Sequence, residues 1–438
     1  MSSQNTPLAY VRKEMLEQQP APRGQVGVAK WMRENLFSGW FNTALTLVSI
    51  YVIYSLLKAV LPWAFGGVWT ADSLQECRTI LNDLHGNTHY ACWAVINERW
   101  NQIVYGTFFP SSEYWRTHIA FVLLILAILP VLFDALPRKM LWITAVYPFL
   151  MVWLIWGGTI WGPVSVALGF VLAYMASQFA GRSLGSGLTG LIAVAVALIW
   201  WFFIGPSVTS GLNKVLPLLH LQEIQSRELG GFVICVIIGV SGIALSLPIG
   251  IVLALGRQSD LLIVKTICVG FIEFIRGVPL ITLLFTASLL LNYFLPPGTE
   301  FDLTLRVIVM VTLFSSAYMA EVIRGGLAAL PKGQYEAADA LGLDYWKAQR
   351  LIIMPQALKI SIPGIVNTFI GLFKDTTLVF FIGIFDMLAA AQAIRANSAW
   401  NGITWELYIF IGLIFWICCF AMSRYSQWLE RKLRTDHR

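Results

Sequence analysis

The residues of this chain that could do chemistry are mainly charged side chains set inside long apolar runs. Glu273 and Arg276 lie three residues apart in one run, and Lys374 and Asp375 are neighbours in another. Such groups are costly in a membrane and usually face other protein segments or a water-filled path. The sequence has no G-x-x-x-x-G-K-[ST] phosphate loop, no Cys/His spacing for zinc and no G-x-S-x-G turn. We therefore expect a chain that is not itself an enzyme and binds no cofactor.

The spacing of Glu273 and Arg276 allows the two side chains to pair on one helix. Gly277 and Pro279 follow and should interrupt that helix, which frees backbone groups at membrane depth. Such a break is tolerated only where it lines a cavity or is buried in protein. Two interpretations stay open: the break borders a substrate path, or the pair orients the helix near its cytoplasmic end.

Lys374 and Asp375 are followed by Thr376 and Thr377 in the same run. Adjacent residues on a helix point about 100° apart, so we expect one of the two charges to reach another helix. A lysine or an aspartate near a path would suit the charged ends of an amino acid. The alternatives are a lock between helices or a contact with a partner subunit.

The elements that must position these residues are apolar helices. The chain has 438 residues, of which 57% are hydrophobic and 12% charged, and its mean hydropathy is +0.70. A soluble domain would carry about twice that share of charge. The sequence therefore predicts an all-α polytopic membrane protein with about ten transmembrane helices. The candidate spans are Phe41–Phe65, His118–Leu136, Met140–Gly157, Val164–Gln178, Leu188–Ile204, Gly230–Leu255, Ile263–Leu291, Leu303–Val322, Ile360–Ile382 and Trp405–Ala421.

The fourth of these runs is short and could be re-entrant. Most of the 30 lysines and arginines fall in segments that are cytoplasmic if both termini are cytoplasmic, as the positive-inside rule requires. Because these basic residues sit beside the spans, the net charge of +6 does not indicate a nucleic-acid partner. The expected parts are a cytoplasmic tail (1–38), an N-terminal membrane region (39–229) with a periplasmic loop (66–117), a C-terminal core (230–425) with a cytoplasmic loop (331–359), and a C-terminal tail (426–438).

Two cysteines, Cys77 and Cys92, fall in the loop that this orientation places outside, whereas the other four cysteines fall in spans. A pair of cysteines in an oxidising compartment suggests a disulfide. The alternative is two unpaired buried thiols.

The cytoplasmic loop contains a polar, helix-prone segment between two spans, Glu336–Pro355. Gly342 can adopt a positive φ and end a first short helix. We expect a second short helix that Pro355 stops. The small residues Ala337 and Ala338 would let another backbone approach closely. Such a helix pair could dock in a groove of a soluble partner, or it could lie on the lipid surface.

The spacing of this segment resembles the EAA loop of ABC importer permeases. Glu336, Ala337, Ala338, Gly342, Ile352 and Pro355 match that pattern, and Leu343 follows its glycine. Further segments resemble the polar amino-acid permeases of the histidine/glutamine type, namely 272–281, 317–327, 330–338 and 371–379. The long N-terminal half is similar to the larger permease subunit of general L-amino-acid importers of Gram-negative bacteria.

This resemblance implies a type I importer fold in the bacterial inner membrane. It implies a second, homologous permease subunit, two ATPase subunits that bind ATP and Mg, and a periplasmic amino-acid-binding protein. Glu336 would contact the ATPase electrostatically, Gly342 would set the bend, and Ala337 and Ala338 would permit close docking. Alternating access would then move L-amino acids inward. A secondary amino-acid transporter is the alternative, but it predicts inverted repeats with matching broken helices, which the sequence does not show.

Overall fold

The computed structural model describes residues 27–181, 186–216, 219–290, 293 and 301–433. Within these residues the chain is helical, and the only β pairing is three isolated bridges. Nine helices in the described part are long and apolar enough to cross a membrane, and a bent pair would make a tenth. The predicted all-α polytopic fold is therefore confirmed. The candidate spans are Trp40–Phe65, Ser111–Leu132, Arg138–Trp156, Trp161–Ala180, Leu188–Val215, Gly231–Arg257, Leu303–Ala328, Tyr345–Ile382 and Trp405–Leu433, with the bent pair Leu262–Gly277 and Leu280–Leu290.

The chain divides into two compact units, of which the first comprises residues 1–68 and 78–92. Its described helices are α1 (Gly27–Asn35), α2 (Trp40–Phe65) and most of α3 (Leu74–His85). No residue of α2 is buried, although the helix is strongly apolar. Such a surface is stable only in an apolar solvent, so α2 has the properties of a helix that faces lipid.

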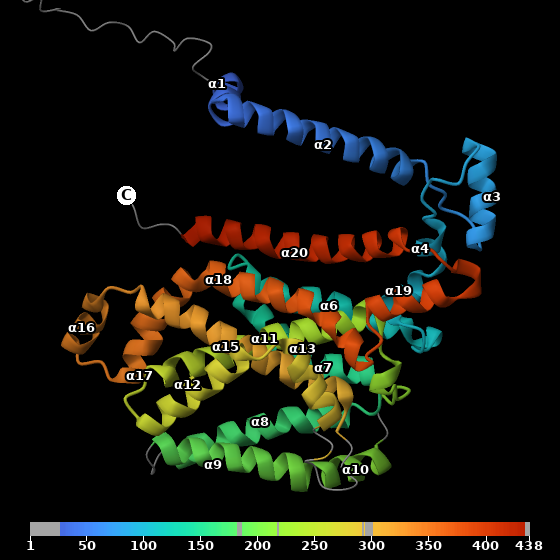
Figure 1. Cartoon of the computed structure of the whole chain (residues 1–438). Helices are drawn as coiled ribbons and strands as arrows, with labels where there is room; N and C mark the ends of the chain where they lie inside the picture. The colour runs from blue at the N-terminus through green and yellow to red at the C-terminus, as the bar shows by residue number, and fades with distance from the viewer. Residues whose placement is uncertain (1–26, 182–185, 217–218, 291–292, 294–300, 434–438) are drawn as a thin grey trace, which may run out of the picture. The chain divides into compact units, whose positions relative to one another are not determined.

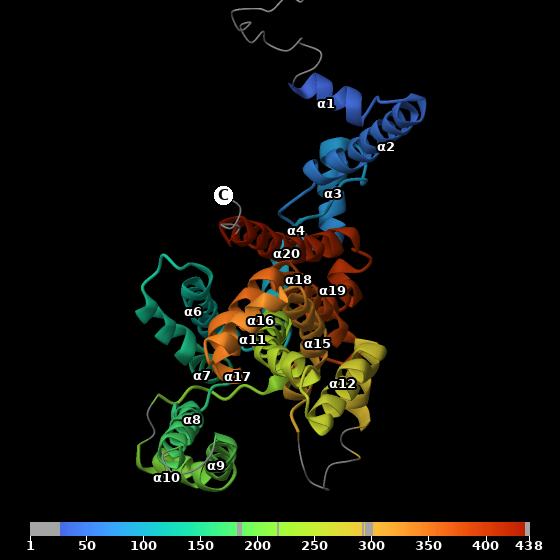
Figure 2. The same cartoon turned by 90° about the vertical axis from the view of Figure 1, so that its left-hand side faces the viewer.

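The first part of the second unit contains short helices and two helix pairs. These are α4 (Ala94–Glu98), α5 (Trp100–Tyr105), η2 (Ser111–Glu113), α6 (Tyr114–Leu132), η3 (Arg138–Met140), α7 (Leu141–Trp156), α8 (Trp161–Ala180), α9 (Ser186–Ile199), η4 (Trp200–Ile204) and α10 (Gly205–Val215). Helix α6 packs on α7, and α8 packs on α9, as Figure 2 shows. Gly169 makes room for the Trp201 indole, because a Cβ there would lie 2.1 Å from the ring nitrogen.

The second part of this unit is the C-terminal core, which begins after η5 (Ser226–Glu228). Its elements are α11 (Gly231–Arg257), α12 (Leu262–Gly277), α13 (Leu280–Phe285), η6 (Thr286–Leu290), α15 (Leu303–Ala328), α16 (Lys332–Ala340), α17 (Tyr345–Ala348), η7 (Gln349–Ile353), α18 (Met354–Asp375), η8 (Thr376–Ile382), α19 (Met387–Ala396), η9 (Ser398–Trp400) and α20 (Trp405–Leu433). Helix α15 packs between α11 and α18, and α18 also packs on α20 (Figure 1).

The contact between α11 and α15 involves small residues on α11. Gly239, Gly242, Ser246 and Gly250 are buried at three- and four-residue spacing, so they share one face of α11. A Cβ at Gly250 would lie 2.7 Å from the Met319 side chain. Small residues at such an interface let two helix backbones approach closely, which is a common way of packing helices in membranes.

Candidate coupling loop and charge cluster

The loop between α15 and α18 is built from the two short helices α16 and α17, which lie together at one end of the core (Figure 1). Helix α16 ends in a backbone motif in which the Leu343 N–H donates to the Ala338 carbonyl (3.2 Å) and the Gly342 N–H to the Asp339 carbonyl (2.9 Å). This is the hydrogen-bond pattern of a Schellman cap, which needs a left-handed residue at the position of Gly342. Gly342 has φ +67°, where a side chain would be strained.

The start of α17 is fixed by Asp344, whose carboxylate accepts from the Lys347 N–H at 3.0 Å and pairs with the Lys347 ammonium at 2.8 Å. These two bonds from Lys347 hold the pKa of the Asp344 carboxyl below its usual range. The cap and the glycine together define the direction of the chain between the two short helices. The sequence therefore specifies the loop geometry locally, without help from distant residues.

The loop is attached to the core through its inner face. Ala338 is buried, and Tyr335 packs against the cluster formed by α11, α15 and α18. The Gln356 amide donates to the Gln334 side chain at 3.0 Å, which links α18 to α16. The small size of Ala338 thus serves packing inside this chain, whereas Ala337 is exposed.

The outer face of the loop carries acidic and large apolar side chains. Glu336 is exposed, and so are Leu341, Trp346 and Leu351. Large exposed apolar residues beside polar ones typically mark a surface that contacts another protein or the membrane. The loop therefore offers a partner both an apolar contact and a negative charge.

The expected stop at Pro355 is wrong. Pro355 is an exposed residue of the first turn of α18. Helical backbone continues from α17 to α18 through η7, a single π-type turn over Gln349–Ile353. Ile352 lies in that turn and packs partly against the core. The second short helix of the loop is therefore joined without a break to a span.

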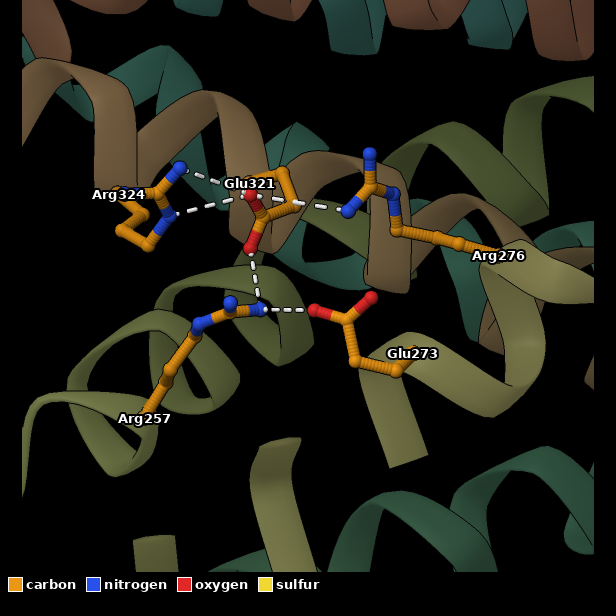
Figure 3. Close-up of polar contacts among 5 residues, drawn as sticks. All are labelled: Arg257, Glu273, Arg276, Glu321 and Arg324. Carbon is orange, nitrogen blue, oxygen red and sulfur yellow. Dashed lines mark hydrogen bonds and ion pairs between the residues drawn. The ribbon is translucent and has the colours of Figure 1, made fainter. Parts of the chain in front are cut away.

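Five charged side chains from three helices meet near this end of the core (Figure 3). Arg257, on α11, contacts Glu321 on α15 at 2.7 Å and Glu273 on α12 at 2.8 Å. Glu321 also contacts Arg324 at 3.1 Å and Arg276 at 3.7 Å. Glu321 thus accepts hydrogen bonds from Arg257 and Arg324 and forms a longer ion pair with Arg276, and it ties α11, α12 and α15 together.

The predicted pairing of Glu273 with Arg276 is wrong, because each side chain has its partner on another helix. The predicted break after Arg276 is present: α12 and the segment Leu280–Leu290 meet at 103°. Arg276 lies in the last turn of α12 and also covers the Tyr318 ring, 5.6 Å from its centre. Arg257 and Glu321, which hold the cluster together, are 64 residues apart in the sequence, and no local pattern indicates their contact.

Lys374 and Asp375 lie at the far end of α18, twenty residues beyond its start, which corresponds to about 30 Å along the helix. Lys374 is exposed, and neither side chain has an ion-pair partner among the described residues. The hydroxyls of Thr376 and Thr377 donate to backbone carbonyls within the same segment. The predicted path residues therefore do not form one site: Glu273 and Arg276 lie in the charge cluster, far from Lys374.

The two cysteines of the loop 66–117 are both buried and both disulfide-bonded. The other four cysteines, Cys235, Cys268, Cys418 and Cys419, are free thiols in helices. The part of the chain that the structure describes holds no group of His, Cys, Asp and Glu side chains that could bind a metal ion.

Comparison with known proteins identifies the family. Residues 246–435 match the family described as "Binding-protein-dependent transport system inner membrane component". The glutamate/glutamine/aspartate/asparagine transport system permease protein BztC of Rhodobacter capsulatus is 59% identical over 98% of this chain and 99% of its own length.

This chain belongs to the amino-acid ABC transporter permeases. The inner membrane amino-acid ABC transporter permease protein YhdY of Escherichia coli is also similar along almost the whole chain, being 40% identical over 95% of this chain and 96% of its own length. A solved structure described as "Crystal structure of an amino acid ABC transporter with histidines" is 30% identical, covers 45% of this chain and 90% of its own, and has a TM-score of 0.41. The permease is thus a multi-pass protein of the inner membrane and a transport subunit, not an enzyme in itself.

Proposed function

We propose that this permease is one transmembrane subunit of an ATP-driven importer that carries L-amino acids from the periplasm to the cytoplasm by alternating access. The carrying observation is the loop α16–α17, with its exposed Glu336 and its apolar outer face, at one end of the core. In this proposal the loop docks on a separate ATPase subunit, which binds ATP and Mg. A second, homologous permease and a periplasmic binding protein complete the importer, and both termini face the cytoplasm.

The full-length similarity to BztC supports glutamate, glutamine, aspartate and asparagine as cargo. These four amino acids share a carboxylate and an ammonium group. Lys374, Asp375 and Thr377, which we assign to the path, can each bind one of these two charged groups. Lys374 and Asp375 lack an ion-pair partner among the described residues, so their charges are available for a ligand or a partner subunit. Thr376 is buried and is assigned only a positioning role.

The test is a comparison of Glu336→Lys with Glu34→Lys in the importer purified from its native membrane. Both glutamates are exposed, and both lie on the side that we assign to the cytoplasm, but Glu34 is outside the loop. We expect Glu336→Lys to lose the ATPase subunit on purification and to lower amino-acid-stimulated ATP hydrolysis at least tenfold. The control should behave as the unmodified protein does.

Retention of the ATPase and of stimulated hydrolysis in Glu336→Lys would contradict the assignment of the loop. Loss in both variants would show that the effect is not specific to the loop. Cargo is tested separately, by uptake of radiolabelled glutamate into proteoliposomes that contain the importer and its binding protein. Competition by aspartate and asparagine but not by lysine is the expected result.

A further inference from the structure

A cavity of about 570 Å³ lies between α5, α6, α7, α11 and α20. On α6 its lining runs from Thr117 to Leu124, and on α11 from Phe232 to Val240. Its volume is typical of small-molecule sites in proteins. The cavity lies where helices of the N-terminal region meet α11 and α20 of the C-terminal core.

Helix α6 is fixed to its neighbours on both sides of this cavity. Near its end, the Tyr425 hydroxyl of α20 donates to the Leu132 carbonyl at 2.7 Å. Near its start, the Tyr105 hydroxyl and the His118 ring are hydrogen-bonded to one another. The first bond lies beyond the cavity, and the second lies in its wall, because Tyr105 and His118 both line it. Helix α6 is therefore attached to its neighbours near both of its ends.

The lining has no charged group to offer a polar ligand. Of the described residues that form it, none is an aspartate, a glutamate, a lysine or an arginine. The Tyr147 hydroxyl already donates to the Ala120 carbonyl (3.2 Å), and the Thr117 hydroxyl to the Tyr114 carbonyl (2.6 Å). An amino acid placed here would lose its hydration without gaining charged partners, which is strongly unfavourable. An apolar occupant would lose no hydrogen bonds with water on entering the cavity.

The cavity opens toward the surface that the membrane covers. Phe121 and Ile417 are exposed at its rim, whereas Leu124 and Ile237 are buried at its base. A stretch of helix about 10 Å long and, with its side chains, about 10–12 Å wide occupies roughly 800 Å³ or more. A partner helix is therefore too large for this cavity of about 570 Å³. A single hydrocarbon chain is narrow enough.

We propose that an acyl chain of a membrane phospholipid occupies this cavity and fills the joint between α6, α7 and the core. An empty apolar cavity leaves its lining without contacts on one side, and a hydrocarbon chain restores them. The exposed faces of α6 and α20, which include Phe121 and Ile417, contact lipid in the membrane, so the occupant is available there. In the predicted orientation the cavity lies in the periplasmic half of the bilayer, because it is lined by the starts of α6 and α11. The proposal does not depend on the identity of the cargo.

The experiment uses the complete importer in vesicles that contain a phospholipid with a photoreactive diazirine in its acyl chain. Labelling should concentrate on the peptides that contain Thr117–Leu124 and Phe232–Val240. Val236→Trp places an indole in the cavity and should reduce this labelling several-fold. Val252→Trp is the matched control: it makes the same change on the same helix, at an exposed position outside the lining. It should label as the unmodified protein does.

A second measurement is the phospholipid that stays bound to the purified importer after prolonged washing with detergent, observed by native mass spectrometry. Retention by the unmodified protein and by Val252→Trp, with loss in Val236→Trp, is expected. Equal labelling and equal retention in both variants would overturn the proposal. Absence of label from both peptides in the unmodified protein would overturn it too, and this result does not depend on whether a variant folds. A cross-link between Ile417→Cys and the partner permease would also overturn the proposal, because a protein contact and not a lipid would then cover the cavity.

Discussion

Replacing Glu321 by glutamine tests the charge cluster directly, because the substitution keeps the shape of the side chain and removes only its charge. Glu321 contacts three arginines and its side chain is 16% exposed, whereas Glu273 contacts one arginine and is 53% exposed. Without Glu321, Arg276 and Arg324 have no acidic partner within the cluster. The same substitution at Glu273 removes an acidic partner from Arg257 alone, and Arg257 still contacts Glu321.

The two substitutions should lower the free energy of unfolding by clearly different amounts. Removing one partner of a fully buried ion pair costs about 3–5 kcal/mol, and exposed pairs contribute about 0–1 kcal/mol. For the partly exposed Glu321 we expect the free energy of unfolding to fall by about 2–3 kcal/mol after discounting for solvent. For Glu273→Gln we expect about 0.5 kcal/mol.

The assay is reversible unfolding of the purified permease in mixed micelles, with the fraction of denaturing detergent as the variable. A double-mutant cycle with Arg257→Gln isolates the contact between Arg257 and Glu321. The coupling should be larger for Glu321 than for Glu273. If Glu273→Gln destabilises the permease as much as Glu321→Gln does, Glu321 is not the centre of the cluster, and the reasoning from burial fails.

Three further substitutions should have measurable effects in the same assay. Gly342→Ala should cost about 1–2 kcal/mol because of the positive φ, and should lower ATPase retention on purification. Gly250→Val should destabilise by about 1–3 kcal/mol through overpacking, whereas Gly270→Val, with nothing near its Cβ, should cost under about 1 kcal/mol; equal costs would refute the close helix contact. Burial raises the pKa of the Asp386 carboxyl from 3.8 to about 7. Because the folded protein favours the protonated carboxyl, the free energy of unfolding should fall as the pH rises between these values. Asp386→Asn should flatten that dependence, and an unchanged pH profile would count against it.

The spans and the break after Arg276 could be predicted from the sequence because both are local properties. Apolar runs of sufficient length predict helices in a membrane, and Gly277 with Pro279 predicts the interruption. The end of α16 is equally local, since it depends on Gly342 and on hydrogen bonds within a few residues. Such features need no knowledge of the packing.

The charge cluster could not be predicted in the same way. Arg257 and Glu321 are 64 residues apart in sequence, and only the close packing of α11 on α15 brings them together. A pair at three-residue spacing, such as Glu273 and Arg276, is worth a few tenths of a kcal/mol on a helix. Because that preference is weak, partners on other helices replaced it.

The sequence also misplaced the end of the second loop helix, for a related reason. In a regular α-helix the proline ring meets the carbonyl four residues earlier. The turn before Pro355 is of the π type, with hydrogen bonds between residues five apart, so the helical backbone continues through Pro355 into α18. A π turn has no signature in residue types here, and it could be found only in the structure.

That single turn over Gln349–Ile353 has a consequence for how the length of this segment can vary. A helix advances by about 100° for each residue, so deleting one residue from the turn would rotate α17 by that angle about the axis of α18. Trp346 and Leu351 would then face in different directions relative to the membrane. Substitutions inside the turn change what the loop displays, but an insertion or a deletion changes where it is displayed. The number of residues between the loop and the span is therefore a constraint on this permease in its own right.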